Sequence, residues 1–477
     1  MPDATLRVRA GGALLLGGAP RRLLRLTPSG RRAALQLLAG APVSTPAQGL
    51  LARRLTTAGM AHPVPTAGGE LTVTAVVPVR DRPEALARCL RALGALDVPT
   101  VVVDDGSDDP AAIRTVCAGH AARVLRHACA RGPAAARNLG VAQLAADVVA
   151  FVDSDIVAGP DSLPRLLAHL ADPQVVAVAP RVLPDRASGA GGRPAGRVLR
   201  QLLAVRSPLD LGAQPAQVQP GTAVPFVPTA CLLVRRTALP AFDEALRYGE
   251  DVDLIWRLID AGGIVRYDPS VQVAHAEPTT WRGALARRHR YGGSAGPLAR
   301  RHGLRLAHLR LGALPLTTAV ALVVAPARVS GPVAAAAAAW TGQHLRRAGL
   351  PPRAAGLLAG QAHAGAACSV GSYLTLLAPL LPAAALLTTR TRRRLTAVVL
   401  APLAAEYLGR RPRLDPLTWL AAAMLDDVAY ASGVWRGCLR ARTAAPLLPN
   451  VRFRPRPRPG MPPAPAGFPA APGPDRP

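Results

Sequence analysis

Two aspartates separated by one residue, Asp153 and Asp155, follow an apolar run from Val148 to Val152. Paired carboxylates at the end of a buried strand can bind a hard divalent cation such as Mn²⁺ or Mg²⁺, and a substrate's phosphates often share that ion. Paired acids also occur where they only solvate a turn or cap a helix, so the motif alone decides little. Its meaning depends on the other polar clusters of the chain.

Two such clusters lie before this pair. Val101–Val103 runs into Asp104-Asp105-Gly106-Ser107, where acids at a strand end could accept hydrogen bonds from the base and ribose of a nucleotide. A solvated turn is the alternative. Arg131-Gly132-Pro133 then leads to Arg137, in a stretch where glycine lets the backbone approach a ligand and arginine can pair with phosphate. An ordinary helix start is the alternative there.

A further acidic cluster opens a helix much later in the chain. Glu250, Asp251 and Asp253 precede the apolar residues of that helix. Acids favour a helix N-terminus because of the helix dipole, so capping is a serious alternative. Three acids within four residues exceed what a cap requires, and one of them could act as a general base for a hydroxyl nucleophile.

Two groups of residues downstream could also bind a ligand. His275 could coordinate a metal ion, although a single histidine is more often structural. Arg287, Arg290 and Tyr291 offer two cations and a ring to a phosphate or a sugar.

The clusters need a scaffold, and the pattern from residue 71 to 305 predicts one. Near-continuous apolar strands alternate there with helices, which indicates a mainly parallel α/β sheet covered on both faces. Expected strands are 73–77, 101–103, 148–152 and 175–179, and expected helices are 83–93 and 163–170. Ligands of such sheets bind beyond the carboxyl ends of the strands, where the acids before residue 156 would lie.

Different patterns flank this domain. Residues 1–68 read as a small winged-helix-like module with strands at 13–16 and 23–26 and helices at 31–38 and 47–58, and 66–69 reads as a linker. DNA binding, docking of a peptide or protein, and a passive structural role all remain open for this module.

The C-terminal part is strongly apolar. Residues 310–445 contain two long uncharged stretches, 311–327 and 354–389, the second followed by an arginine-rich block. This pattern predicts membrane association, with one or two crossings and a location at the cytoplasmic face of the cell membrane. A bundle of buried alanine-rich helices is the alternative. The Pro- and Arg-rich residues 446–477 are expected to be disordered.

Composition excludes some partners. The 477 residues carry a formal net charge of +28, but every basic residue is arginine, and arginine, alanine, proline and glycine are enriched together. With aromatics at only 3%, no base-stacking pattern accompanies the charge, so we expect no nucleic-acid partner. The six cysteines show no C-x-x-C spacing, which argues against a zinc site and fits a reducing compartment.

The joint order and spacing of the clusters resembles family 2 inverting glycosyltransferases with the GT-A fold. The resemblance rests on Asp104–Ser107, Ala136–Asn138, Asp153–Asp155 and Glu250–Asp251. It implies that Asp104 or Asp105 holds the uridine of a UDP-sugar and that Asp155, helped by Asp153, binds Mn²⁺ or Mg²⁺ on the diphosphate. His275 is a further possible ligand of that metal.

The same resemblance implies roles for the remaining residues. Asp251, with Glu250 beside it, would be the catalytic base. The nucleotide-sugar site would comprise Pro78, Arg80, Asp104, Asp105, Arg137 and Asp153. Arg287, Arg290 and Tyr291 are similar to the Arg-x-x-Arg-Trp motif of processive members and would contact the acceptor or the diphosphate. Tyrosine replaces tryptophan here, a departure that bears on acceptor stacking and processivity.

The whole architecture resembles the mycofactocin-system glycosyltransferases of actinobacteria, which add glucose units to a redox cofactor derived from a ribosomal peptide. That resemblance implies transfer of a hexose, glucose, from UDP-glucose to a peptide-derived small molecule or a growing glycan. Two other interpretations stay open: a membrane-associated transferase of cell-wall polysaccharide or glycolipid synthesis, and a DNA-binding regulator with a degenerate enzyme domain.

Overall fold

The computed structural model describes residues 1–19, 21–65, 70–185, 194–377 and 388–452. Within it the chain forms two compact units. The first combines residues 1–306 with 403–446, and the second combines 307–402 with the described residues from 447 on. The linker expected at 66–69 and most of the tail expected to be disordered lie outside the described residues.

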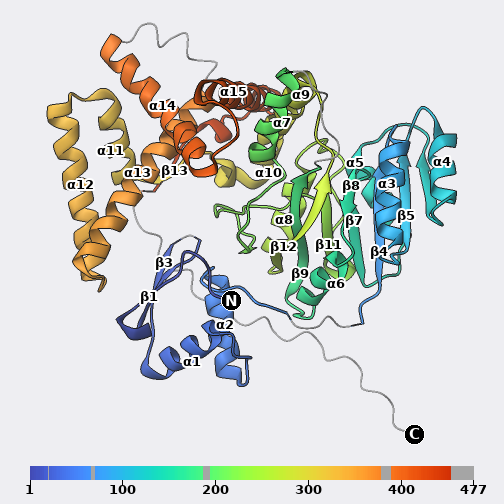
Figure 1. Ribbon diagram of the computed structural model, residues 1–477, viewed down its shortest axis with the longest axis horizontal. Coiled ribbons are helices and arrows are strands. Elements are labelled where there is room, and N and C mark those ends of the chain that lie inside the picture. Colours follow the sequence, from blue (N-terminus) through green and yellow to red (C-terminus); the bar gives the residue numbers. More distant parts are fainter. Residues whose placement is uncertain (20, 66–69, 186–193, 378–387, 453–477) are drawn as a thin grey trace. The chain divides into compact units, whose positions relative to one another are not determined.

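A mainly parallel sheet is the centre of the first unit (Figure 1). Its described strands run in the order β10-β12-β9-β11-β7-β4-β5-β6, and β8 pairs with β12. The strands are β4 (Val73–Val79), β5 (Thr100–Asp105), β6 (Arg123–His127), β7 (Val148–Val152), β8 (Ile156–Ala158), β9 (Val175–Pro184), β10 (Ala216–Gln217), β11 (Cys231–Arg235) and β12 (Ile264–His275).

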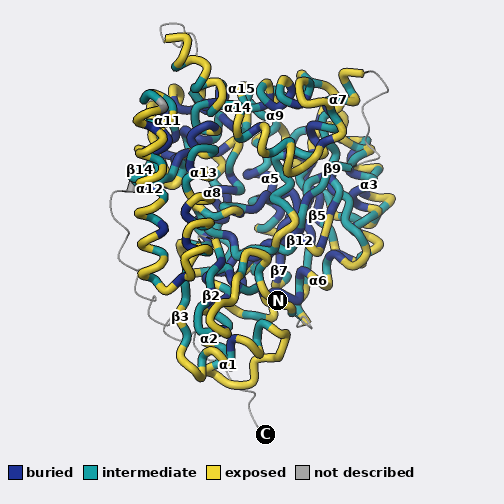
Figure 2. The backbone as a smooth tube through the Cα atoms, turned by 60° about the vertical axis from the view of Figure 1, so that its left-hand side comes forward, coloured by how far each residue is buried: buried dark blue, intermediate teal, exposed yellow. Residues whose placement is uncertain are grey.

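Helices cover both faces of this sheet, as its uninterrupted apolar strands require. One apolar cluster joins the sheet to α3 (Pro83–Gly94), α4 (Pro110–Ala118) and α6 (Ser162–His169). A second cluster joins the other face to α5 (Pro133–Val141) and α8 (Glu250–Asp260). Figure 2 shows that buried residues are concentrated along the strands. The α/β prediction with a mainly parallel sheet is confirmed.

Strand directions bring the polar clusters to one edge. β4 runs parallel to both β5 and β7, so their carboxyl ends, with Asp104 and Asp153, lie on the same side. Antiparallel β11 separates β7 from β9, and β12 runs parallel to β9. β8 pairs antiparallel with the end of β12, which places His275 opposite Ile156 and so beside Asp155.

The helix α15 (Pro416–Arg440) belongs to this first unit, although its sequence reads as part of the apolar region 310–445. It packs along α9 (Trp281–Gly293) and α10 (Ala295–His302). Glycines make the contact close: a Cβ added at Gly296 would lie 2.1 Å from the carbonyl oxygen of Gly437. One at Gly437 would lie 2.3 Å from the carbonyl oxygen of Gly293.

Ion pairs reinforce the position of α15. The Arg288 Nε on α9 lies 3.0 Å from an Asp426 carboxylate oxygen. The Arg206 Nη2, at the end of α7 (Pro194–Arg206), lies 2.7 Å from Asp427. Arg206 Nη1 also lies 3.5 Å from Asp426, so these mostly buried charges form one network.

The N-terminal module is a three-stranded antiparallel sheet, β1-β2-β3, packed on two helices. Its elements are β1 (Arg7–Arg9), β2 (Leu14–Gly17), β3 (Arg22–Arg25), α1 (Pro28–Leu38) and α2 (Pro46–Thr57). Thr27 and Thr45 cap the helices, and Leu15, Leu55 and Met60 form the core. The structure adds β1 to the two expected strands. The winged-helix classification stays a prediction.

The second unit is mostly helical. It contains α11 (Ala313–Val324), α12 (Ala327–Arg347), α13 (Pro352–Leu376) and the first part of α14 (Thr389–Arg410), which continues into the first unit. A short strand β13 (Arg310–Gly312) pairs in parallel with β14 (Asn450–Arg452).

The expected membrane crossings are not present among the described helices, none of which is both long and apolar enough to span a bilayer. At 1.5 Å per residue α11 is only about 18 Å long, against about 30 Å of hydrocarbon. α12 contains Pro332 and ends in basic residues. This finding overturns the predicted crossings and the predicted location at the cytoplasmic face of the cell membrane. Residues 378–387 of the longer uncharged stretch lie outside the described residues.

The glycine contact between α15 and the end of α9 gives a stability test. We expect Gly437→Ala to destabilise the first unit by about 2–3 kcal/mol, because its methyl group would overlap a backbone carbonyl. Denaturant unfolding followed by circular dichroism measures the change. Gly409→Ala is the matched control, since a Cβ at Gly409 meets nothing within 4 Å. Equal stability of Gly437→Ala and the parent protein would contradict the close packing.

Candidate functional site

The Asp153-Ser154-Asp155 turn directly follows β7, as expected. The Asp153 N–H donates to the Ala230 carbonyl at 2.9 Å, and the Ile156 N–H donates to the Asp153 carbonyl at 3.0 Å. These backbone bonds fix the turn. The carboxylates of Asp153 and Asp155 therefore extend from the same turn but contact different partners.

Asp155 is buried between two cationic or potentially cationic groups. Arg82 Nη1 donates to its Oδ2 at 2.7 Å, and His275 Nε2 lies 3.4 Å from its Oδ1. His275 Nδ1 is also buried and finds no hydrogen-bond partner in the described part of the chain. Asp155 and His275 are thus two adjacent donors that suit a divalent cation.

The described residues contain no complete protein cage for a metal. Among the described residues, no group of three or more His, Cys, Asp or Glu side chains is arranged to hold an ion. Mg²⁺ is commonly held by one or two carboxylates together with substrate phosphates and water, so a two-donor arrangement still fits such an ion.

Asp153 instead faces Arg137, which α5 places beneath the edge of the sheet. Arg137 is 3% exposed. Its Nη2 donates to Asp153 Oδ1 at 2.8 Å and its Nη1 donates to Glu250 Oε1 at 2.9 Å. Burial opposes the charge of the guanidinium, but the two carboxylates outweigh it and raise the pKa of Arg137. Arg137 therefore joins the metal-motif turn to the first turn of α8.

The acids that open α8 have separate roles. The helix begins after Gly249, whose φ of 82° is in the left-handed region. Glu250 pairs with Arg137, as described. Asp253 is buried and accepts from Arg257 Nε and His302 Nε2, both at 2.8 Å. Asp253 thus anchors the helix to α10.

Asp251 is the acid left for chemistry. Its Oδ1 accepts only the N–H of the adjacent Val252, at 2.7 Å, among the hydrogen bonds found for the described residues. Burial, and then the negative charge of Glu250, raise the pKa of Asp251 to about 7. A carboxyl group with such a pKa suits a general base at neutral pH.

Asp104 and Asp105 are buried and already hydrogen-bonded within the protein. Asp104 accepts from the Ser107 N–H at 2.9 Å and from Arg126. Asp105 accepts from the N–H groups of Arg131 and Gly132 and contacts His127 Nδ1 at 2.8 Å. Burial opposes its charge, but these bonds hold the pKa of Asp105 below its usual range. Contact of either aspartate with uridine stays a prediction.

Pro78 and Arg80 lie at the end of β4 and just beyond it. Pro78 pairs with Val103 of β5. Arg80 is exposed, with its Nε 3.3 Å from Asp81 Oδ2. Both residues therefore lie at the same edge of the sheet as Asp104, and their role in nucleotide binding is untested.

The three residues expected to contact acceptor or diphosphate lie on α9. Arg287 forms an ion pair with Glu277, which also accepts from Ser207 Oγ at 2.6 Å. Arg290 lies over the ring of Tyr248, 5.9 Å from its centroid. Burial raises the pKa of Tyr291 to about 12; Arg287 opposes the shift, and the charges of Asp251 and Asp153 add to it. Tyr291 therefore lies near the acids of the site.

Sequence reasoning missed several participants. Arg82 pairs with Asp155, far along the chain, and Glu277 pairs with the nearer Arg287. Tyr248 supplies an exposed ring beside Arg290. Glu277 follows His275 by two residues, so its place just after a strand was the one available signal. Nothing local marks Arg82 as the partner of an acid 73 residues away.

Comparisons with known proteins identify the family of the chain. The family model described as Glycosyl transferase family 2 matches residues 74–241. A pre-mycofactocin glycosyltransferase of Mycobacterium tuberculosis (strain CDC 1551 / Oshkosh) is 37% identical over 486 aligned residues, covering 94% of this chain and 97% of the relative. The protein of that name from strain H37Rv matches equally well.

Two solved structures are more distant. A mannosyltransferase from Pyrobaculum calidifontis, in complex with GDP-Man and Mn²⁺, has a TM-score of 0.44 and 18% identity, covering 86% of this chain and 94% of that one. Glucosyl-3-phosphoglycerate synthase from Mycobacterium tuberculosis, with Mn²⁺ and UDP, has a TM-score of 0.34 and 22% identity, covering 49% and 80%.

The decisive comparison is the near-full-length one, because its 37% identity extends over almost all of both chains. The α/β sheet and the acids at its edge agree with that relationship. The chain is an enzyme and belongs to glycosyltransferase family 2.

Proposed function

We propose that this enzyme transfers a hexose, glucose, from UDP-glucose to a hydroxyl group of a peptide-derived acceptor, with inversion at the anomeric carbon. The acceptor class follows from the name of the relatives, pre-mycofactocin glycosyltransferase, whose similarity extends over 94% of this chain. Repeated transfer onto the growing glycan would give an oligosaccharide. The N-terminal module, for which a winged-helix-like fold stays a prediction, would dock the peptide-derived acceptor.

The observation that carries the proposal is the bridge made by Arg137. It holds Asp153, from the end of β7, and Glu250, from the start of α8, within 2.9 Å of one guanidinium. A sugar-nucleotide transferase needs a leaving-group side and a base side that face one reacting carbon. The bridge supports such a pairing, because it ties together the two elements that carry these functions.

Asp251 is the proposed base. It would accept the proton of the acceptor hydroxyl as that oxygen attacks C1 of the sugar, while the C1–oxygen bond to UDP breaks on the opposite face. A single displacement of this kind inverts the configuration at C1. Glu250 would act indirectly, because its charge helps raise the pKa of Asp251.

Asp155, His275 and, from the same turn, Asp153 would hold Mn²⁺ or Mg²⁺. When bound, such an ion neutralises charge on the departing diphosphate. Pro78, Arg80 and Asp104 or Asp105 are the proposed contacts to the nucleotide. Arg287, Arg290 and Tyr291 remain proposed contacts to the acceptor or diphosphate, with Arg287 drawn toward Glu277.

The rival interpretations have less support. A polysaccharide or glycolipid transferase is not favoured, since both curated relatives bear the pre-mycofactocin name. A regulator with a degenerate enzyme domain has less support, since the near-full-length relatives are named as glycosyltransferases.

The first test concerns the base. We expect Asp251→Asn to lower kcat for transfer from UDP-glucose by about 10²- to 10⁴-fold, the usual contribution of general-base catalysis. UDP binding and circular dichroism should be unchanged. Asp260→Asn, at the exposed end of the same helix, is the matched control and should keep full activity. Full activity of Asp251→Asn would remove Asp251 from the mechanism.

The second test concerns pH. Because Asp251 must be deprotonated to act and its pKa in the free protein is about 7, kcat/KM should fall as the pH drops through about 7. Because the pKa of Asp251 is higher in the folded than in the unfolded state, ionising it lowers the free energy of unfolding. This loss is complete above the folded-state pKa and absent below the unfolded-state pKa. Asp251→Asn should therefore raise the melting temperature at pH 8 relative to the parent, but not at pH 3.5. A flat pH profile of kcat/KM between pH 5 and 8 would contradict the assignment.

The third test concerns the metal. We expect Asp155→Ala to abolish the Mn²⁺-dependent part of UDP binding in titration calorimetry, because an acid ligand is lost. His275→Ala should weaken the same binding to a smaller degree. Asp161→Ala, an exposed aspartate six residues further on, serves as control. Unchanged Mn²⁺-dependent affinity in Asp155→Ala would exclude it as a ligand.

A further inference from the structure

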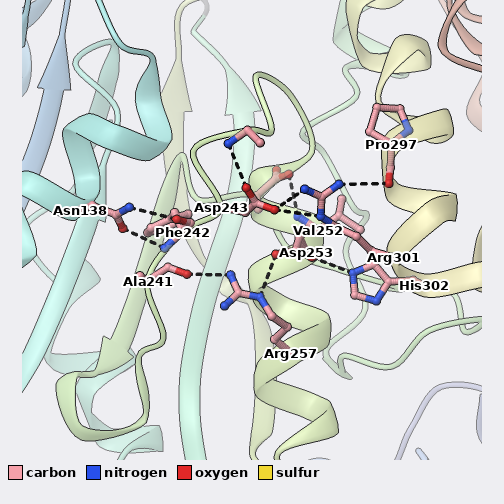
Figure 3. A network of polar contacts seen from close by, with 12 residues as sticks. Asn138, Ala241, Phe242, Asp243, Val252, Asp253, Arg257, Pro297, Arg301 and His302 are labelled. Atoms are coloured by element: carbon pink, nitrogen blue, oxygen red, sulfur yellow. Dashed lines mark hydrogen bonds and ion pairs between the residues drawn. The ribbon is translucent and has the colours of Figure 1, made fainter. Parts of the chain in front are cut away.

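Asn138 lies next to Arg137 on α5 but points to a different partner. Its Nδ2 donates to the Phe242 carbonyl at 3.0 Å, and its Oδ1 accepts from the Phe242 N–H at 2.8 Å (Figure 3). Nδ2 also contacts Glu244 Oε1 at 3.0 Å. The side-chain amide therefore satisfies both backbone groups of one residue in the loop before α8, as a neighbouring strand would.

Phe242 connects this clamp to Arg137. The ring is 3% exposed and packs edge-on against Phe151 of β7, with centroids 5.1 Å apart. The Arg137 guanidinium carbon lies 5.5 Å from the centroid of the same ring. Phe242 thus touches both the strand that precedes Asp153 and the arginine that binds Asp153.

Three contacts hold the Arg137 guanidinium in the described part of the chain. Its Nε is buried and has no hydrogen-bond partner within the described residues, so two carboxylates and the Phe242 ring hold the guanidinium. Since a buried charge is stable only when its pairing geometry is kept, a shift of the ring would weaken one carboxylate contact.

The other side of the same loop is fixed independently. Arg301 Nε on α10 donates to Asp243 at 2.9 Å, and Arg257 Nη2 donates to the Ala241 carbonyl at 2.9 Å (Figure 3). These contacts lie beside the Asn138 clamp but do not involve Arg137. They provide a control for general loosening of the loop.

We propose that Asn138 is a positioning residue, which acts through Phe242 to hold Arg137 between Asp153 and Glu250. Through Glu250 the same contact sets the placement of Asp251 relative to the leaving-group side of the site. The inference rests on the proposed function, and it assigns to Asn138 a role in alignment rather than in contact with either substrate.

The test measures UDP release from UDP-glucose with Mn²⁺ in the full-length protein. We expect Asn138→Ala to lower kcat by about 30- to 100-fold, as misplacement of a catalytic group by about 1 Å does. The KM for UDP-glucose should stay within about threefold, because the removed amide touches no part of the proposed donor site. A general loss of folding would not produce this split.

A second variant tests the route of the effect. Phe242→Leu keeps the backbone bonds to Asn138 but removes the ring beside Arg137, and it should lower kcat by about 10-fold. Because both changes act on Arg137 through one contact, the double variant should lose little more than Asn138→Ala alone. Arg301→Gln, which breaks the Asp243 contact, should leave kcat within about twofold.

The outcomes separate this inference from the proposed function. Absence of UDP release in the parent protein with Mn²⁺ would contradict the proposed donor and, with it, the positioning role that rests on that function. An active parent with unchanged kcat in Asn138→Ala, or with additive losses in the double variant, would overturn the inference alone. If Asn138→Ala does not fold, Asn138→Asp, which keeps the acceptor for the Phe242 N–H, replaces it with the same expected split.

Discussion

The charge of Arg137 must be balanced inside the protein, and much of the site follows from that requirement. An arginine cannot shed its proton at ordinary pH, so a buried guanidinium needs acids within hydrogen-bonding distance. Asp153 and Glu250 meet that need from segments nearly 100 residues apart. The end of β7, the middle of α5 and the start of α8 are therefore fixed to one another. A site assembled from three distant segments becomes rigid through a single side chain.

The same requirement explains why α8 opens with three acids. The helix dipole favours negative charge there, but burial resists it. Glu250 is paired with Arg137, and Asp253 is paired with Arg257 and hydrogen-bonded to His302. Asp251 has no cation at hydrogen-bonding distance among the described residues; burial, and then the negative charge of Glu250, raise its pKa to about 7. The cluster thus contains two acids held by side-chain partners and one that is not, which is the acid proposed as the base.

Local patterns in the sequence predicted much of this arrangement. The bounds expected for the strand before Asp153 match β7, and the rule that ligands bind beyond parallel strand ends placed Asp104 and Asp153 at one edge. Partners distant in the sequence were not predictable, because nothing local marks Arg82 for Asp155 or Phe242 for Asn138. The apolar composition also did not predict what α15 packs against, because buried helices and membrane-spanning helices have the same composition. The glycines at 292, 296, 433 and 437 pack α9 and α10 against α15 in the first unit. The sequence alone does not distinguish such packing glycines from glycines that break a helix.

The two arginines at the Asp153-Ser154-Asp155 turn differ in a way that bears on the order of binding. Arg137 is buried and has two acid partners, so its removal from Asp153 would leave charges unpaired in a dry environment. Arg82 reaches Asp155 from a side chain that is 61% exposed, whereas Asp155 itself is buried. On the proposed function Asp155 would hold the divalent cation in place of its contact with Arg82, while the Arg137 bridge would stay in place. The turn thus combines a buried counter-charge, Arg137, with a largely exposed one, Arg82, and on the proposed function only the second would have to move when the donor binds.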